Sequence, residues 1–222
     1  PFKGWNLNAE LAVRAFASQR TALGFSDVPV MGLGHSFGGV LTSLIMAEHP
    51  TLFKRAVVLD PVLFSATMAI AITMAEMTGL AALARSARRR RAHWPDRAAA
   101  IESLRDRGTY KGWCEEALQA FATHALRPAD DDEGVVLKCR PSREAEIFAS
   151  APVGLWTSLR NVRIPAPPTP ATHTLPLLAP PAERWRVSNR HVAVARVDGG
   201  HCFMQVDPDG TAPPTSVPLE VK

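Results

Sequence analysis

The sequence predicts an α/β fold, with a partial parallel sheet and a helical lid inserted after one of its strands. Three observations carry this prediction. Residues 8–60 alternate between helical and strand patterns, which is typical of parallel strands joined by helices. A glycine-rich turn at residues 32–39 joins a strand pattern directly to a helical one. Residues 62–150 then show helical patterns, with no clear strand except at residues 135–139.

The predicted sheet starts with four alternating segments. An apolar face over residues 8–23 predicts a helix, with Asn8 as its N-cap. The short apolar runs at residues 28–33 and 56–59 fit strands that are buried on both faces of a parallel sheet. Residues 37–49 between them predict the connecting helix.

The rest of the chain divides into a lid, a return to the sheet and a tail. The lid helices are expected near residues 65–87, 96–107, 114–126 and 141–150. Seven prolines crowd residues 164–181, and a segment this rich in proline cannot supply a central strand. Residues 191–197 predict a final strand. We therefore expect a sheet domain at residues 1–61 and 160–206, a lid at 62–159 and a loose tail at 207–222.

The glycine-rich turn has the chemistry of an activated serine. Its sequence is GLGHSFGG, and the small residues around Ser36 let the strand and the helix pack closely through a sharp turn. The backbone N–H of Phe37, at the helix start, then points at the oxygen that Ser36 attacks. A serine needs a base to take its proton, usually a histidine. Of seven histidines, His201 has the best context because it follows two glycines and a predicted strand; a surface histidine is the alternative.

These segments together resemble the α/β-hydrolase fold superfamily. The resemblance lies in GHSFGG at residues 34–39, AVVLDP at 56–61 and GGH at 199–201. The middle of the chain resembles the lidded bacterial esterase-like members, with an arginine run before a Trp-Pro pair. The resemblance implies Ser36 as nucleophile and His201 as base, with the Phe37 N–H expected in the oxyanion hole. We expect no cofactor and no metal, since Cys114, His124 and Cys139 lack a recurrent metal-binding spacing.

The acid that would orient His201 is harder to assign. Family members usually carry it in a segment that corresponds to residues 162–176, which here contain no Asp or Glu. Some members carry it after the strand that follows the nucleophile, and Asp60 occupies that place. The alternative is that Asp60 only caps a helix or makes an Asp-Pro turn. Asp198 is too close to His201 in sequence to orient it easily, and Glu183 is a distant reserve.

A second departure from the family lies upstream of the turn. Only 35 residues precede Ser36, and the chain starts at Pro1 rather than Met. The family's earlier strands and its second oxyanion donor have no counterpart in so short a stretch, which is expected to leave an exposed sheet edge. A truncated or decayed hydrolase-fold protein with little or no catalysis, acting as a binding or interaction module, is therefore the rival interpretation.

Three residues are expected to line the substrate site. They are His35 beside the nucleophile, and Met68 and Met74 on the first lid helix, where methionines adapt to irregular apolar ligands. Plain core packing is the alternative for the methionines. The arginine run 88–91 fits a solvated lid face or an anchor for an acidic substrate group better than a nucleic-acid site, because aromatic residues are not interleaved with it.

The amino-acid composition limits which classes of protein and which cellular locations fit this chain. A hydrophobic fraction of 46% and a charged fraction of 21% suit a folded domain, and a formal charge of +4 says little about partners. Three cysteines make no paired framework, which favours a reducing, cytoplasmic location. The longest apolar run, residues 61–75, is too short to span a bilayer.

We therefore expect a serine hydrolase that cleaves an ester or related acyl bond of a small, largely apolar substrate. A small molecule is the expected partner, with no nucleic acid and no membrane, and the oligomeric state is left open. The same triad also serves carbon–carbon bond cleavage and cofactor-free haloperoxidation, and fold alone does not choose among these reactions.

Overall fold

The computed structural model describes residues 2–65, 67–68, 79–130, 133–165, 168–174 and 179–215. The chain forms two compact units. The parallel-sheet unit comprises Lys3–Met74 and Ser150–His201, and the antiparallel-sheet unit comprises Pro1–Phe2, Ala75–Ala149 and Cys202–Lys222.

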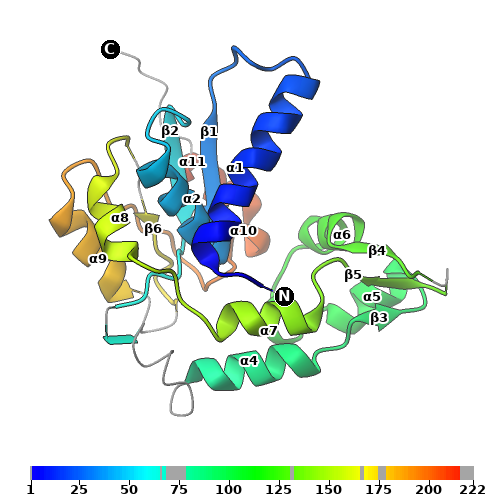
Figure 1. Ribbon diagram of the computed structural model, residues 1–222. Helices are drawn as coiled ribbons and strands as arrows, with labels where there is room; N and C mark the ends of the chain where they lie inside the picture. Colours follow the sequence, from blue (N-terminus) through cyan, green and yellow to red (C-terminus); the bar gives the residue numbers. More distant parts are fainter. Residues whose placement is uncertain are drawn as a thin grey trace. The chain divides into compact units, whose positions relative to one another are not determined.

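Three strands make the sheet of the parallel-sheet unit. They are β1 (Met31–His35), β2 (Arg55–Leu59) and β6 (Pro168–Thr169), in the order β1-β2-β6 and all parallel (Figure 1). The register pairs His35 with Leu59 and Leu59 with Thr169, so the carboxyl ends of the strands are aligned. The proline-rich segment thus gives a two-residue strand at an edge of the described sheet. At the other edge lies β1, with Leu33 70% exposed, which confirms the expected exposed edge.

Helix α2 (Phe37–Glu48) is the centre of this unit. It packs against α1 (Trp5–Ala22), α8 (Leu155–Asn161), β1 and β2. Its side chains Val40, Leu44 and Met46 are fully buried, which explains why this helix is apolar on most faces rather than along one stripe. Figure 1 shows α1 alongside α2, and α9 (Ala179–Ser188) completes the unit near α8.

The first helix begins earlier than its sequence pattern indicates. Its N-cap is Gly4 rather than Asn8, and the amide of Asn8 donates to the carbonyl oxygen of Gly4 at 2.7 Å. Trp5 opens the helix because its side chain, 3% exposed, is buried against aromatic neighbours. The burial of one large aromatic side chain therefore extends the helix beyond the residue whose local propensity favours a cap.

The antiparallel-sheet unit contains a small sheet that the sequence analysis predicted only in part. Its strands β3 (His93–Trp94), β5 (Val135–Leu137) and β4 (Leu126–Pro128) pair in the order β3-β5-β4. The prediction of an otherwise all-helical segment is therefore wrong. Strands of two or three residues are too short to display an alternating pattern, so they leave no period to detect. The indole of Trp94 is fully buried and forms the centre of this unit's core.

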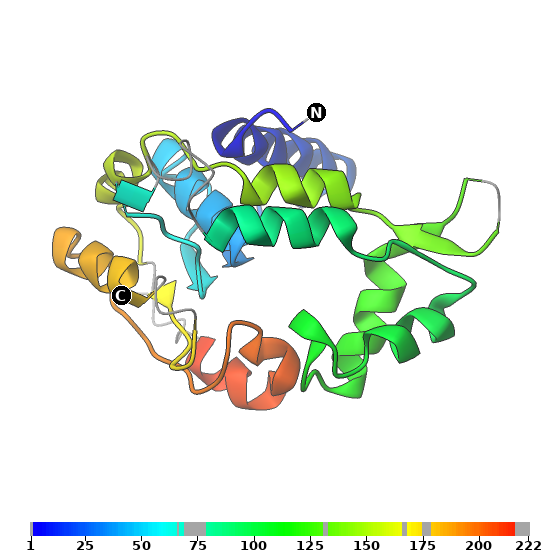
Figure 2. The same ribbon diagram turned by 90° about the horizontal axis from the view of Figure 1, so that it is seen from below.

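Two helices of this unit pack against that sheet, α5 (Arg97–Leu104) against β3 and α6 (Glu115–His124) against β4. Helices α4 and α7 pack side by side, as Figures 1 and 2 both show. The bounds of the described helices here are α4 (Gly79–Arg89), α5 (Arg97–Leu104), the 3₁₀ turn η1 (Gly108–Tyr110), α6 (Glu115–His124), α7 (Pro141–Phe148), α10 (Phe203–Val206) and α11 (Pro208–Thr215). The tail predicted to be loose after Val206 is thus helical over α11, and the backbone N–H of Cys114 donates to the carbonyl oxygen of Gln205 at 2.9 Å.

The predicted final strand at residues 191–197 is wrong. Within the described segments only Val197 makes a parallel bridge, to Ala171. The N–H groups of Ala195 and Val197 donate to the carbonyl oxygens of Pro168 and Pro170 at 3.2 and 3.3 Å. Neither proline can donate in return, because proline has no backbone N–H. The hydrogen-bond ladder is therefore incomplete, and the apolar run stays extended without becoming a strand.

The arginine run does not form a continuous charged face. Arg90 is partly buried, and its guanidinium binds both carboxylate oxygens of Glu144 at 2.9 and 2.7 Å and the hydroxyl of Tyr110. Arg91 donates to the carbonyl oxygen of His93 at 2.8 Å and stacks over Trp94. Two of the four arginines therefore hold the antiparallel-sheet unit together, which no charge pattern in the sequence reveals.

Among the described residues, no helix is both long and apolar enough to cross a bilayer.

Candidate active site

Ser36 occupies a strained turn between β1 and α2. Its backbone has φ 53° and ψ −117°, a region that non-glycine residues rarely adopt. The turn is possible because small residues surround it. A Cβ added at Gly34 would collide with the carbonyl oxygen of Gly38 and with Oγ1 of Thr42. The backbone N–H of Ser36 donates to the carbonyl oxygen of Leu59 at 3.0 Å, which fixes the turn to the end of β2.

His201 contacts the serine from the far end of the unit's sequence. Its Nε2 lies 2.9 Å from Oγ of Ser36, and its Nδ1 lies 2.6 Å from Oδ2 of Asp60. A carboxylate oxygen can only accept a hydrogen bond, so Nδ1 carries the proton of a neutral ring and donates it. Nε2 is then the free acceptor for the Ser36 hydroxyl. The arrangement can take the proton of Ser36 when its oxygen attacks a substrate.

Asp60 is held in place by the proline-rich segment. It directly follows β2 with φ 37°, and only 1% of it is exposed. Its Oδ1 accepts a hydrogen bond from the backbone N–H of Ala171 at 3.1 Å, and its Oδ2 accepts one from Oγ1 of Thr174. The segment where the family usually carries its acid therefore supplies donors instead. These bonds and the one from His201 satisfy a carboxyl group that burial would otherwise penalise.

The two alternative candidates for the triad acid, Asp198 and Glu183, have other hydrogen-bond partners. Asp198 accepts a hydrogen bond from Oγ1 of Thr172 at 2.7 Å, and its side chain is 90% exposed. Glu183 pairs with Arg186 on α9. Asp60 is accordingly the carboxyl group that the structure brings to His201.

His35 contacts the loop that carries His201. Its Nε2 lies 2.8 Å from the backbone carbonyl oxygen of His201, and the two rings lie 4.7 Å apart. A carbonyl oxygen only accepts, so Nε2 of His35 is the donor. Burial, reinforced by the nearby charge of His201, lowers the pKa of His35 and favours this neutral form. A substrate contact of His35 stays a prediction.

The remaining predicted residues surround the turn or fall outside the described part. Phe37 is the first residue of α2, and its ring packs edge-on against Trp5 at 4.6 Å. Trp5 in turn packs against Phe64 at 5.7 Å, so an aromatic cluster flanks the turn. Met68 is half-buried, and its backbone N–H donates to Oγ of Ser65 at 3.1 Å. Met74 lies outside the described residues.

Sequence reasoning missed the donors to Asp60. Thr174 and Ala171 lie in a segment that looked empty because it has no carboxyl group. A usable signal exists, since a hydroxyl residue at the place of a missing acid can hold an acid supplied by the neighbouring strand. Within the described ranges, no group of three or more His, Cys, Asp or Glu is arranged to bind a metal ion.

One family model matches the chain over most of its length. The model of the alpha/beta hydrolase family matches residues 3–213. Mouse (Mus musculus) monoglyceride lipase is 42% identical over 41 residues, which are 18% of this chain and 14% of that enzyme.

Solved structures share the fold at low identity. An E-2-(acetamidomethylene)succinate hydrolase superposes with a TM-score of 0.71 at 18% identity, over 94% of this chain and 71% of that one. A peroxisomal alpha-beta-hydrolase from Saccharomyces cerevisiae gives 0.70 at 14% identity, over 94% of this chain and 58% of that one. An esterase from Mycobacterium tuberculosis gives 0.56 at 18% identity, over 95% of this chain and 65% of that one. The chain thus spans only part of the length of these relatives.

Proposed function

Because the chain belongs to the alpha/beta hydrolase family, we propose that it is a serine hydrolase that cleaves an ester or related acyl bond of a small, largely apolar substrate. One observation carries the proposal. Ser36, His201 and Asp60 come from three separate segments, yet their side chains are joined by hydrogen bonds of 2.9 and 2.6 Å. A chain of nucleophile, imidazole and carboxylate in this order is what acyl transfer by serine requires.

In the proposed reaction, Oγ of Ser36 attacks the carbonyl carbon of the substrate while Nε2 of His201 takes the hydroxyl proton. The negative oxygen of the tetrahedral intermediate accepts a hydrogen bond from the backbone N–H of Phe37. His201 then gives its proton to the leaving alcohol, and an acyl-enzyme remains on Ser36. Water attacks this ester while His201 takes its proton, and the proton returns to Oγ of Ser36 as the acid leaves.

Asp60 has a supporting role in this mechanism. Its carboxylate accepts the proton-bearing Nδ1 of His201, which keeps Nε2 free to act as the base. The carboxylate also stabilises the imidazolium that forms during attack. Because Asp60 is itself fixed by Ala171 and Thr174, the imidazole is oriented before the substrate arrives.

The choice of substrate class is part of the proposal. The apolar substrate comes from the sequence-based expectation alone, since Trp5 and Phe64 beside the turn are each 3% exposed and pack in the core. Among the similar proteins, one is called an esterase and one a monoglyceride lipase, which supports an ester as the first bond to test. We further propose that the protein works in the cytoplasm, since Cys114, Cys139 and Cys202 carry no disulfide bond.

Hydrolysis of short-chain p-nitrophenyl esters tests the proposal. The purified chain should release p-nitrophenol with saturation kinetics, and Ser36→Ala should abolish this activity. Ser18→Ala is the matched control, because Ser18 is exposed on α1 and should leave the rate unchanged. A folded protein whose Ser36→Ala variant hydrolyses as fast as the parent would contradict the mechanism and favour a binding protein.

A further inference from the structure

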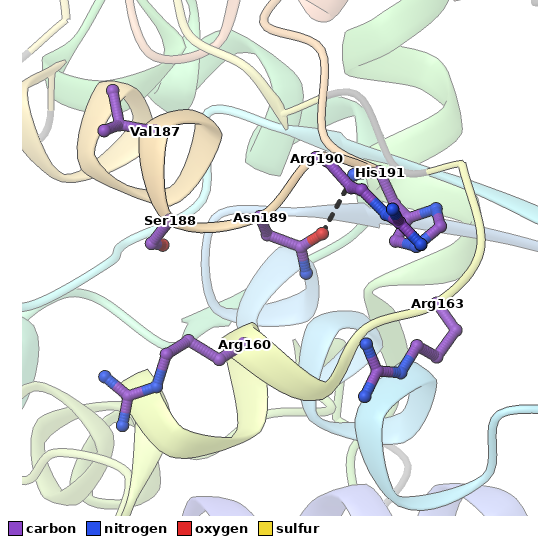
Figure 3. Close-up of a pocket in the computed structure, with 7 residues that line it drawn as sticks. All are labelled: Arg160, Arg163, Val187, Ser188, Asn189, Arg190 and His191. Carbon is purple, nitrogen blue, oxygen red and sulfur yellow. Dashed lines mark hydrogen bonds between the residues drawn. The ribbon is translucent and has the colours of Figure 1, made fainter.

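A recess lies in the parallel-sheet unit, where α8 and α9 end. It has a volume of about 340 Å³. Figure 3 shows the side chains that surround it, from the end of α8, the segment after it, and the end of α9 with the residues that follow. The lining residues are Arg160, Arg163, Val187, Ser188, Asn189, Arg190 and His191. The proposed hydrolase mechanism uses none of them.

The floor of this recess is rigid. Asn189 is 6% exposed, and its amide nitrogen donates to the carbonyl oxygens of Leu159 and Val162, each at 2.9 Å. Its Oδ1 accepts a hydrogen bond from the backbone N–H of His191 at 2.9 Å, drawn dashed in Figure 3. One buried side chain therefore ties the end of α8 to the turn after α9, so the surrounding groups are carried on fixed backbone.

The rim of the recess carries excess positive charge. Arg160, Arg163 and Arg190 are exposed, and among the described residues none of them has a carboxylate within ion-pair distance. Two helix C-termini contribute a partial negative charge of about −0.5 each, which leaves a net charge of about +2. The carbonyl oxygen of Leu159, near the end of α8, already accepts hydrogen bonds from Asn189 and from the indole of Trp185. This helix-end carbonyl therefore does not need the arginines as donors.

We propose that this recess binds a phosphate group. Guanidinium groups match the oxygens of phosphate and carboxylate with paired N–H donors. In Figure 3 the guanidinium group of Arg160 points away from Arg163 and Arg190, so it adds to the charge of the rim rather than to a shared contact with one ligand. A phosphate monoester has three terminal oxygens and a charge between about −1.5 and −2, which matches the net charge of the rim. The ring of His191 can add an N–H donor beside the arginines, whereas the hydroxyl of Ser188 already donates to the carbonyl oxygen of Trp185 at 3.1 Å.

Binding of inorganic phosphate to the full chain tests the proposal. Phosphate is titrated at constant ionic strength while the ¹H–¹⁵N resonances of the Asn189 side chain and the His191 backbone are followed. We expect saturable shifts, and Arg163→Gln should weaken binding roughly tenfold by removing one charged, paired donor. Arg14→Gln is the matched control, since it removes the same charge from an exposed site on α1 in the same unit. Ser36→Ala should leave phosphate binding unchanged.

A vesicle-binding experiment distinguishes a lipid phosphate from a soluble phosphate ester. Retention on phosphatidylcholine vesicles only when they contain phosphatidic acid, lost in Arg163→Gln, supports a lipid phosphate. Binding of inorganic phosphate without vesicle retention supports a soluble phosphate ester. Shifts that do not saturate, an equal response to acetate, or equal weakening by Arg163→Gln and Arg14→Gln would overturn the proposal.

Discussion

Replacement of Asp60 by asparagine tests the proposed orientation of His201. Asp60 accepts hydrogen bonds from Nδ1 of His201 at 2.6 Å, from the backbone of Ala171 at 3.1 Å and from Oγ1 of Thr174. An asparagine keeps one oxygen and turns the other into a donor. Either the N–H₂ group then faces His201 and Thr174, which share Oδ2 in the parent, or the amide flips and its N–H₂ confronts the backbone N–H of Ala171.

The effect on the rate should be large. If the amide N–H₂ faces Nδ1, His201 moves its proton to Nε2 and loses its ability to take the proton of Ser36. In serine triads this change lowers kcat by about 10⁴, which corresponds to about 5.4 kcal/mol of transition-state stabilisation. A donor left without its acceptor in so buried a place should also lower the free energy of unfolding by about 1–3 kcal/mol.

The assay is kcat for a p-nitrophenyl ester, measured on protein whose fold is checked by circular dichroism and urea unfolding. Asp198→Asn is the matched control, because Asp198 is close to His201 in sequence but has a side chain that is 90% exposed. It should keep kcat within about threefold, as expected for an exposed polar contact. A folded Asp60→Asn variant with kcat within tenfold of the parent would refute the assignment of Asp60.

Four further predictions concern residues around the turn and in the antiparallel-sheet unit. His35→Ala removes the hydrogen bond to the His201 backbone and should lower kcat about tenfold with KM unchanged, whereas an unchanged kcat would rule out a positioning role. Burial and the nearby His201 charge lower the pKa of His35 below 6.5, so acidification below that pH protonates the unfolded chain more than the folded one. The free energy of unfolding should therefore fall as the pH is lowered. An equal fall with pH in His35→Gln and in the parent would contradict this. Gly34→Ala should destabilise the protein by about 1–3 kcal/mol in urea unfolding while Gly38→Ala, whose Cβ meets no atom, should not, and the reverse order would refute the packing argument. Arg90→Ala should lower the unfolding midpoint more than Arg88→Ala, since only Arg90 binds Glu144, and equal midpoints would show that this ion pair adds no stability.

The serine turn could be predicted because its determinants are local. The strand, the small residues and the helix follow one another within residues 31–48, and the collision expected at Gly34 explains why the pattern needs a glycine there. His201 could be nominated from its glycines, but its contact with Ser36 depends on a chain path that no local pattern encodes. The same holds for Asp60, because only the fold reveals which of several carboxyl groups reaches the imidazole of His201.

The failed predictions share a physical cause. The apolar run at residues 191–197 has the composition of a strand, but it lies beside Pro168 and Pro170, which cannot return its hydrogen bonds. The strands of the antiparallel-sheet unit are too short for a period, and their pairing is decided by tertiary contacts such as those of Trp94. Likewise, the arginine run looks like a surface feature until Glu144, far along the chain, is seen to bind Arg90. Patterns confined to neighbours in sequence cannot report such partners.

Mass-spectrometric mapping of a fluorophosphonate adduct asks whether Ser36 is an activated nucleophile, because the probe reacts with a serine only when a base activates it. We expect a single phosphonylated peptide carrying the modification on Ser36, with labelling that His201→Gln abolishes. A folded chain that stays unmodified, or one that labels equally well after Ser36→Ala, would contradict it.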